Sequence, residues 1–237
     1  MIDELVPLEA LRGERHFRWR GGNVSRLEAL TDSAFALAMT LLVVSTEVPG
    51  DFDELRATFQ RLPAFAACFA LFILLWYYHY QFHRRFGLEN LYTIFLNVCL
   101  LFLILFYVYP AKFLFTKVVD QFVFDKPVRF EHANTLMLYY SGGVVGIFLL
   151  FTLMYLHAYK HREVLGLNHV EVHLTRTTIR EHLIHVGVGL ASIVLALAGS
   201  AALAGLVYLL VGPLQGLNGW ISGRAVRSGR VPVTLSE

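Results

Sequence analysis

The sequence is poor in charge and in cysteine. Only 16% of its 237 residues are charged, and residues 183–222 contain no Asp, Glu, Lys or Arg. The formal net charge is +2, which gives no indication of a nucleic-acid partner. The two cysteines, Cys68 and Cys99, both lie inside apolar runs. There, a small packing residue is a more ordinary role than a disulfide.

Signatures of common enzymes and of secretion are also missing. There is no His-Glu-x-x-His zinc motif and no Gly-x-Ser-x-Gly nucleophile elbow. Residues 1–22 carry acids and arginines without an apolar core, so a cleaved signal peptide is not expected. We therefore expect that the protein is not an enzyme and that its first apolar helix directs membrane insertion.

Long apolar stretches separated by short charged clusters make up most of the chain. Hydrophobic residues account for 56% of it, and a helix needs about 20 of them in succession to cross a bilayer. Backbone polar groups in lipid must be paired within the protein, so runs of this length predict an all-α integral membrane protein, not a β-barrel. Six spanning helices are predicted, with a hairpin turn near Gly199 and Ser200: 26–47, 63–83, 89–111, 135–159, 178–198 and 201–221.

Lysine and arginine are divided unequally between alternate connections, and this division predicts orientation. Most of the 20 fall on the side of the two termini: Arg12, Arg15, Arg18, Arg20, Arg26, Arg84, Arg85, Lys160, Arg162, Arg176, Arg180, Arg224, Arg227 and Arg230. Both termini are therefore expected in the cytoplasm. The predicted organisation is a cytoplasmic arm at 1–22, a six-helix domain at 23–222 and a cytoplasmic tail at 223–237.

Two further features concern the opposite side of the membrane. Pro110 is expected to end the third helix, because proline disrupts a helix interior. The first outer loop is acidic, and it either raises the cation concentration at an outer mouth or is an ordinary solvated loop. Its acids are Glu47, Asp51, Asp53 and Glu54.

The first predicted helix differs from a plain lipid-facing anchor. It begins with Arg26, Glu28 and Asp32, and ionisable groups near a membrane are costly unless they face water or a partner. At the helical period, six residues share one face: Leu30, Ser33, Leu37, Thr40, Leu41 and Val44. Apolar side chains alternating with hydroxyls suit a narrow, intermittently wet pathway between copies of this helix, while a simple packing stripe has the same periodicity.

Asp32 points away from that face and needs a hydrogen-bond donor. An unpaired buried carboxylate is strongly unfavourable. Candidate donors lie on the second and third predicted helices: Trp76, His79 and Asn97.

These residues also carry a resemblance. The string Arg26-x-x-x-Leu30-Thr31-Asp32, with the apolar run after it, resembles the Arg-x-x-x-Phe-Ser-Asp signature of the transmembrane protein 175 family, potassium channels of endolysosomes and bacteria. The family's second helix is resembled by Trp76-x-x-His79. Its third helix is resembled by Asn97, which precedes a leucine-rich run ending at Pro110. The likeness covers about residues 26–110. Leu30 stands in place of the usual Phe, and Thr31 in place of Ser.

The resemblance implies a six-helix unit whose first helix lines a potassium-selective pore, with an apolar constriction in place of a selectivity-filter loop. It places the constriction on Leu37, the selectivity threonine on Thr40 and further lining positions on Leu41 and Val44. Single-unit bacterial members assemble as homotetramers, so a plasma-membrane homotetramer is expected. Expected partners are K⁺, other monovalent cations and the lipid bilayer, with no nucleic acid. No metal site and no cofactor is expected beyond the permeant ion.

Histidine is abundant near the predicted cytoplasmic helix ends. The pairs 79/83, 157/161 and 169/173 have a spacing that presents two rings on one helix face. Such pairs suit haem ligation, a transition-metal site or a proton sensor, and they are also ordinary interfacial side chains. A haem-binding electron-transfer protein is therefore the alternative function. A secondary transporter is a further alternative, although no inverted repeat is evident.

Overall fold

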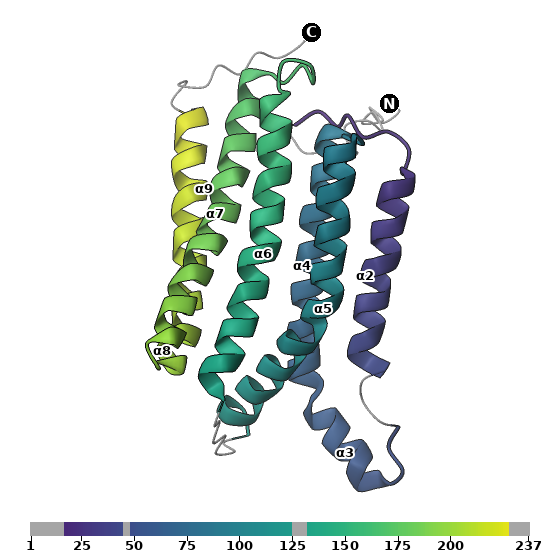
Figure 1. Ribbon diagram of the computed structural model, residues 1–237, viewed down its shortest axis with the longest axis vertical. Coiled ribbons are helices and arrows are strands. Elements are labelled where there is room, and N and C mark those ends of the chain that lie inside the picture. The colour runs from purple at the N-terminus through teal and green to yellow at the C-terminus, as the bar shows by residue number, and fades with distance from the viewer. Residues whose placement is uncertain (1–16, 45–47, 125–131, 228–237) are drawn as a thin grey trace, which may run out of the picture.

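The computed structural model describes residues 17–44, 48–124 and 132–227. Its regular elements in these ranges are helices (Figure 1): α2 (Arg26–Val44), α3 (Phe52–Gln60), α4 (Leu62–Phe86), α5 (Leu91–Phe122), α6 (Ala133–Lys160), α7 (His169–Leu197), α8 (Ala201–Leu206), the 3₁₀ helix η1 (Val207–Leu210) and α9 (Val211–Arg227). Most of the predicted arm, the end of the tail, Glu47 and the side chain of Val44 lie outside the described residues.

Long apolar helices dominate the described chain. Five stretches are long and apolar enough to cross a membrane: Leu62–Phe86, Leu91–Phe122, Ala133–Lys160, His169–Leu197 and Ala201–Ala225. Apolar side chains also cover the outside of the bundle: on α5, Phe95, Phe102 and Phe106 are 63%, 69% and 69% exposed. Because rows of exposed phenylalanine suit lipid and not water, the prediction of an all-helical membrane protein is confirmed.

The helices form two groups that meet along α5 and α6 (Figure 1). On one side α2 packs against α4 and α5, and on the other α7 packs against α6 and α9. The described chain begins and ends at the upper end of the bundle in Figure 1. Aromatic and aliphatic side chains fill the interior between the helices: Phe35, Phe72, Phe82, Leu100, Ile104, Phe151 and Tyr155.

The prediction that Pro110 ends the third helix is wrong. α5 continues through Pro110 to Phe122, and its lower part bends away from the upper part (Figure 1). An internal proline removes one backbone hydrogen bond and kinks a helix without having to end it, particularly among packed membrane helices. Ala111 is fully buried, and the Nζ of Lys112 donates to the carbonyl of Leu42 at 2.9 Å. The extension is thus held against the last turn of α2.

Other helix ends are set by capping. α7 begins at His169, earlier than the predicted 178, because Asn168 and Glu171 form a reciprocal capping box. The predicted turn at 199–200 is present: Gly199 has φ +81°, and the amide of Ser200 donates to the carbonyl of Leu195 at 2.9 Å. Such a residue with positive φ after a helix is a common C-terminal cap.

Part of the acidic outer loop is helical, which the sequence did not indicate. Asp51 caps α3 by accepting from the amide of Glu54 at 2.8 Å. The carboxylate of Glu54 in turn accepts from the amide of Gly50 at 2.7 Å. These two acids therefore stabilise the start of a short helix in the connection between α2 and α4.

Candidate ion pathway on the first helix

The start of α2 is a capping box. The amide of Glu28 donates to Ser25 Oγ at 3.1 Å, and the amide of Ser25 donates to Glu28 Oε1 at 3.4 Å. The other carboxylate oxygen of Glu28 lies 3.7 Å from a guanidinium nitrogen of Arg84 at the end of α4. Sequence reasoning assigned Glu28 no partner, although Ser-x-x-Glu before an apolar run is a recognisable helix start.

α2 has one buried and one exposed face. Phe35 and Ala38 are fully buried and Leu42 is 1% exposed. On the opposite face Leu37 is 51% exposed, and the residues around it are also exposed: Ala29, Leu30, Ser33, Ala36 and Thr40. Leu41 is half-buried at the edge of this face. Because α2 lies at the side of the bundle (Figure 1), its exposed face is open to lipid or to another copy of the chain.

The hydroxyls on the exposed face are held by their own helix. Ser33 Oγ donates to the carbonyl of Ala29 at 2.9 Å, and Thr40 Oγ1 donates to the carbonyl of Ala36 at 2.8 Å. A hydroxyl that donates its proton to the backbone retains two lone pairs on oxygen. These oxygens can therefore act as acceptors, or as cation ligands, without further reorientation.

The signature residues on α2 contact the two neighbouring helices separately. Trp76 Nε1 donates to Asp32 Oδ1 at 2.8 Å. Asn97 Nδ2 donates to Thr31 Oγ1 at 2.9 Å, and His79 Nε2 lies 2.9 Å from Asn97 Oδ1. Of the three candidate donors, then, Trp76 reaches Asp32, whereas Asn97 and His79 are bonded in a different chain.

The hydrogen bonds of Thr31, Asn97 and His79 form one continuous chain. All three side chains are buried. Thr31 Oγ1 completes the series by donating to the carbonyl of Leu27 at 2.9 Å. Linked hydrogen bonds in a low-dielectric interior reinforce one another and make partial disruption costly. This chain therefore fixes the rotation of α2 relative to α4 and α5.

Arg26 differs from the other signature residues. It is the first residue of α2 and is exposed. Within the described part of the chain, no hydrogen bond or ion pair of its side chain is found. At this end of α2, the ion pair to a neighbouring helix is formed by Glu28 and Arg84. Neither residue was assigned to the site from the sequence.

Residues 17–22 form a segment that ties α2 to the second group of helices. Arg20 donates to Glu171 at 2.7 Å and to the carbonyls of Leu165 and Gly166 at 2.6 and 3.0 Å. The amides of Arg20 and Gly21 both donate to the carbonyl of Arg84, at 3.0 and 3.1 Å. We call residues 17–22 the connecting segment, because it joins α4, the α6–α7 turn and α7 just before α2 begins.

The predicted histidine pairs lie in different surroundings. His79 is bonded to Asn97, as described above. His157 Nε2 lies 2.7 Å from Asn90 Nδ2, and His173 Nε2 lies 2.9 Å from Ser222 Oγ. One member of each pair is therefore bound to a neutral polar side chain. Among the described residues, no group of three or more His, Cys, Asp or Glu side chains is placed to hold a metal.

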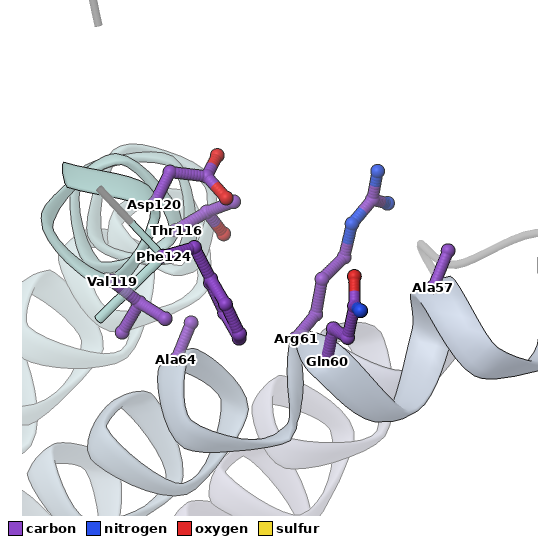
Figure 2. A pocket seen from close by; sticks show the side chains of 8 residues that line it. All are labelled: Ala57, Gln60, Arg61, Ala64, Thr116, Val119, Asp120 and Phe124. Atoms are coloured by element: carbon purple, nitrogen blue, oxygen red, sulfur yellow. The ribbon is translucent and has the colours of Figure 1, made fainter. Parts of the chain in front are cut away.

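A small pocket lies at the lower end of the bundle. Its volume is about 100 Å³, which is enough for a few water molecules. Figure 2 shows Arg61 and Gln60 on one side of it and Asp120 on the other. Its lining residues come from α3, α4, and α5 with the residues that follow it, and none comes from α2.

Comparisons with known proteins define the class of this bundle further. Residues 26–107 match the family model described as endosomal/lysosomal potassium channel TMEM175. A protein named potassium channel from Marivirga tractuosa is 37% identical over 229 residues, covering 90% of this chain and 93% of that protein.

Two solved structures are also similar. The first is a crystal structure of a variant of the potassium channel MtTMEM175 with a nanobody–MBP fusion protein. It has a TM-score of 0.79 and 34% identity, covering 90% of this chain and 99% of the other. The second, a TMEM175 homologue from Chamaesiphon minutus, has a TM-score of 0.59 and 21% identity, covering 81% and 96%. At that identity it supports the fold alone.

The fold and these likenesses define a multi-pass ion-channel protein of the membrane, and not an enzyme. The chain belongs to the TMEM175 family of potassium channels. The resemblance predicted from Arg26 to Pro110 is thereby confirmed, and the matched range is nearly the same.

Proposed function

We propose that the protein conducts potassium through a pore lined by α2 in a homotetramer. The observation that carries this proposal is the two-sided character of α2. Its buried face is fixed to α4 and α5, while Ser33, Leu37 and Thr40 stay exposed in the single subunit. The potassium channel from Marivirga tractuosa, similar along nearly its whole length, supports the same function.

A closed ring of subunits is the simplest way to enclose such a pathway. One helix cannot surround water by itself, and identical subunits usually assemble with closed cyclic symmetry. Small residues let helix backbones approach closely in a membrane, and the exposed face of α2 carries Ala29 and Ala36 beside its hydroxyls. Four copies of α2 around one axis would bring these faces together.

Leu37 is proposed as the constriction of this pore. Four leucines around an axis would form an apolar ring in which a cation loses part of its hydration shell. Potassium is larger than sodium and holds its water less tightly, so it passes such a ring at lower cost. The result is a moderate preference for potassium without a loop of carbonyl ligands.

Thr40 and Ser33 are proposed to replace part of the lost hydration. Each hydroxyl already donates to its own helix, so its oxygen lone pairs remain for an ion. Leu41 and Val44 are proposed as further lining positions toward the lower end of the pathway. No cofactor is part of this proposal, because the only ligand it requires is the permeant ion.

The upper end of the bundle is proposed to face the cytoplasm of a plasma membrane. Arg84 lies in the last turn of α4, Arg176 near the start of α7 and Arg224 near the end of α9. These helix ends lie at the upper end of the bundle in Figure 1, and cytoplasmic ends of membrane proteins carry an excess of such charge. Both ends of the described chain lie at this end (Figure 1). Both termini are therefore proposed to be cytoplasmic.

A liposome flux assay tests the function. Purified protein is reconstituted with a potassium gradient in one sample and a sodium gradient in a matched one, and efflux is followed with empty liposomes as the control. Potassium efflux faster than sodium efflux is expected. Efflux no faster than from empty liposomes, with a correctly assembled protein, would remove the proposal. An absorption spectrum of the same sample tests the alternative, since a Soret band would indicate haem.

A further inference from the structure

Two arginines lie over one tyrosine at the upper end of α6 and α7. Arg162, in the turn after α6, has its guanidinium carbon 5.0 Å from the centroid of the Tyr159 ring. Arg176, on α7, has its guanidinium carbon at the same distance of 5.0 Å. Arg176 Nε also donates to the hydroxyl of Tyr159 at 3.0 Å, and its Nη2 donates to the same oxygen. One ring thus positions two cations from different segments.

The carboxylates around this pair balance little of its charge. Glu163 lies 3.2 Å from Arg162, but its side chain is 86% exposed, and such surface pairs contribute little. Glu171 is 1% exposed and is engaged by Arg20. Within the described residues, Arg176 forms no ion pair. Lys160 and Arg180, both exposed, add further positive charge at the same end.

The pair also lies where the sequence predicts the boundary of the membrane. Tyr159 is the last residue but one of α6, and the sequence predicts the membrane boundary at 159 on this helix and at 178 on the next. On α9, Trp220 is 55% exposed and has the guanidinium of Arg224 at 5.2 Å from its ring. Tyrosine and tryptophan with basic neighbours mark the interface between hydrocarbon and water. A membrane placed on this boundary brings the two guanidiniums level with lipid phosphates.

We propose that Tyr159, Arg162 and Arg176 form a binding site for the phosphate of an anionic phospholipid. Guanidinium groups recognise phosphate through paired N–H donors. Arg176 is exposed and the side chain of Arg162 is 38% exposed, so a headgroup can reach both. The aromatic ring restricts both arginines before the lipid arrives, which lowers the entropic cost of binding. Basic sites between helix ends on the cytoplasmic side commonly bind anionic lipid headgroups.

Lipid at this site would also strengthen the contact with the connecting segment. The α6–α7 turn that carries Arg162 supplies the carbonyls of Leu165 and Gly166 to Arg20. A lipid phosphate joining Arg162 to Arg176 therefore restrains the turn on which Arg20 depends. The site should raise the thermal stability of the folded subunit whether or not the pore conducts.

Lipid binding is measured directly by native mass spectrometry of the full-length protein. Protein in detergent is titrated with phosphatidylglycerol and, separately, with phosphatidylcholine. The wild-type protein should bind the first phosphatidylglycerol at least about tenfold more tightly than the first phosphatidylcholine. Each charge-assisted hydrogen bond of this kind raises the affinity by about a factor of ten. An equal affinity for both lipids overturns the proposal without any variant.

Variants then locate the site. The double variant Arg162→Gln, Arg176→Gln should lose most of the preference for phosphatidylglycerol. Lys160→Gln is the control, because Lys160 is a neighbouring charge that is not placed on the Tyr159 ring, and this variant should keep the preference. If the double variant and Lys160→Gln lose the preference equally, the attraction is spread over the charged surface and the site is overturned. If the double variant does not fold, Arg176→Gln is measured alone. Its affinity for phosphatidylglycerol should fall about tenfold, and an unchanged preference for this lipid overturns the site.

The source of the phosphate is tested separately. Protein in nanodiscs of phosphatidylcholine should gain thermal stability when phosphatidylglycerol is included, and inorganic phosphate should not reproduce the gain. An equal gain with inorganic phosphate would overturn the lipid assignment. Because these measurements do not involve ion flux, their failure is distinguishable from failure of the proposed channel function.

Discussion

Arg20 and Glu171, which lie 151 residues apart in the sequence, form an ion pair of 2.7 Å at the upper end of the bundle. Glu171 is 1% exposed at its side chain, and it also caps α7 and accepts from the amide of Arg18. One carboxylate therefore starts a helix, neutralises a guanidinium and anchors the connecting segment. This couples the position at which α2 begins to the second group of helices.

Removing this carboxylate should weaken the fold. Glu171→Ala leaves the Arg20 guanidinium without its partner and removes half of the capping box, and we expect a loss of about 3 kcal/mol. Glu171→Gln should lose less, because glutamine can still complete the capping box. Thermal unfolding in detergent measures both. Arg18→Gln is the matched control, because Arg18 donates to Glu171 through its backbone amide, which the substitution retains. A Tm drop in Arg18→Gln equal to that of Glu171→Ala would contradict the assignment.

Leu37 and Thr40 should separate conductance from selectivity. Leu37→Ala widens the proposed apolar ring, so flux of potassium should rise. Thr40→Ala removes a hydroxyl oxygen from the pathway, and the potassium-to-sodium flux ratio should fall by about fivefold, which corresponds to ~1 kcal/mol of differential stabilisation. Both are read in the liposome assay.

A control for these variants lies on another helix. Phe102→Leu changes an exposed residue of α5 and should leave both flux and selectivity as in wild type. If Leu37→Ala and Thr40→Ala also match wild type, α2 does not line the pathway.

Asp32 should matter more for assembly than for selectivity. Its carboxylate accepts from Trp76 Nε1 at 2.8 Å, so Asp32→Ala and Trp76→Phe remove the same hydrogen bond. Each should lower the Tm and the yield of assembled oligomer. The double variant should lose less stability than the sum of the two single losses, with a coupling energy of about 1 kcal/mol. Size-exclusion chromatography with thermal unfolding measures this. Strict additivity, or an assembled Asp32→Ala protein that has lost its ion preference, would refute the structural role.

Two adjacent glycines of α6 provide a sharp test of packing. A methyl group at Gly143 would overlap the ring of Tyr107, which is 3% exposed, whereas one at Gly142 would meet nothing within 4 Å. Gly143→Ala should therefore lower stability by about 1–3 kcal/mol through overpacking. Gly142→Ala should be neutral or slightly stabilising, because alanine favours helix. Equal Tm values for the two variants would show that α5 and α6 do not approach as described.

Several features could be predicted from the sequence because each depends on a short stretch of residues. Long apolar runs required helices, since lipid offers the backbone no hydrogen bonds. The hairpin at Gly199 and the family signature at Arg26 to Asp32 were likewise evident from short stretches of sequence. The helix starts at Ser25 and Asn168 carried equally local capping patterns, with Glu28 and Glu171 three residues on, and sequence reasoning passed over them.

The pairing of side chains from distant segments depended on the tertiary structure. Trp76, His79 and Asn97 were equal candidates for Asp32, and only the packing of α4 and α5 against α2 assigned Trp76 to Asp32 and Asn97 to Thr31. The continuation of α5 through Pro110 depended in the same way on the contacts beyond it.

The sequence by itself determined that the chain is a helical membrane protein of a potassium-channel family, because hydrophobic length and a charged helix-start motif act within one segment. Only the tertiary structure decided which face of α2 is covered and that Arg20 meets Glu171. The physical reason is that burial and ion pairing between distant segments are set by how the helices pack, and helical periodicity alone does not choose among the possible neighbours.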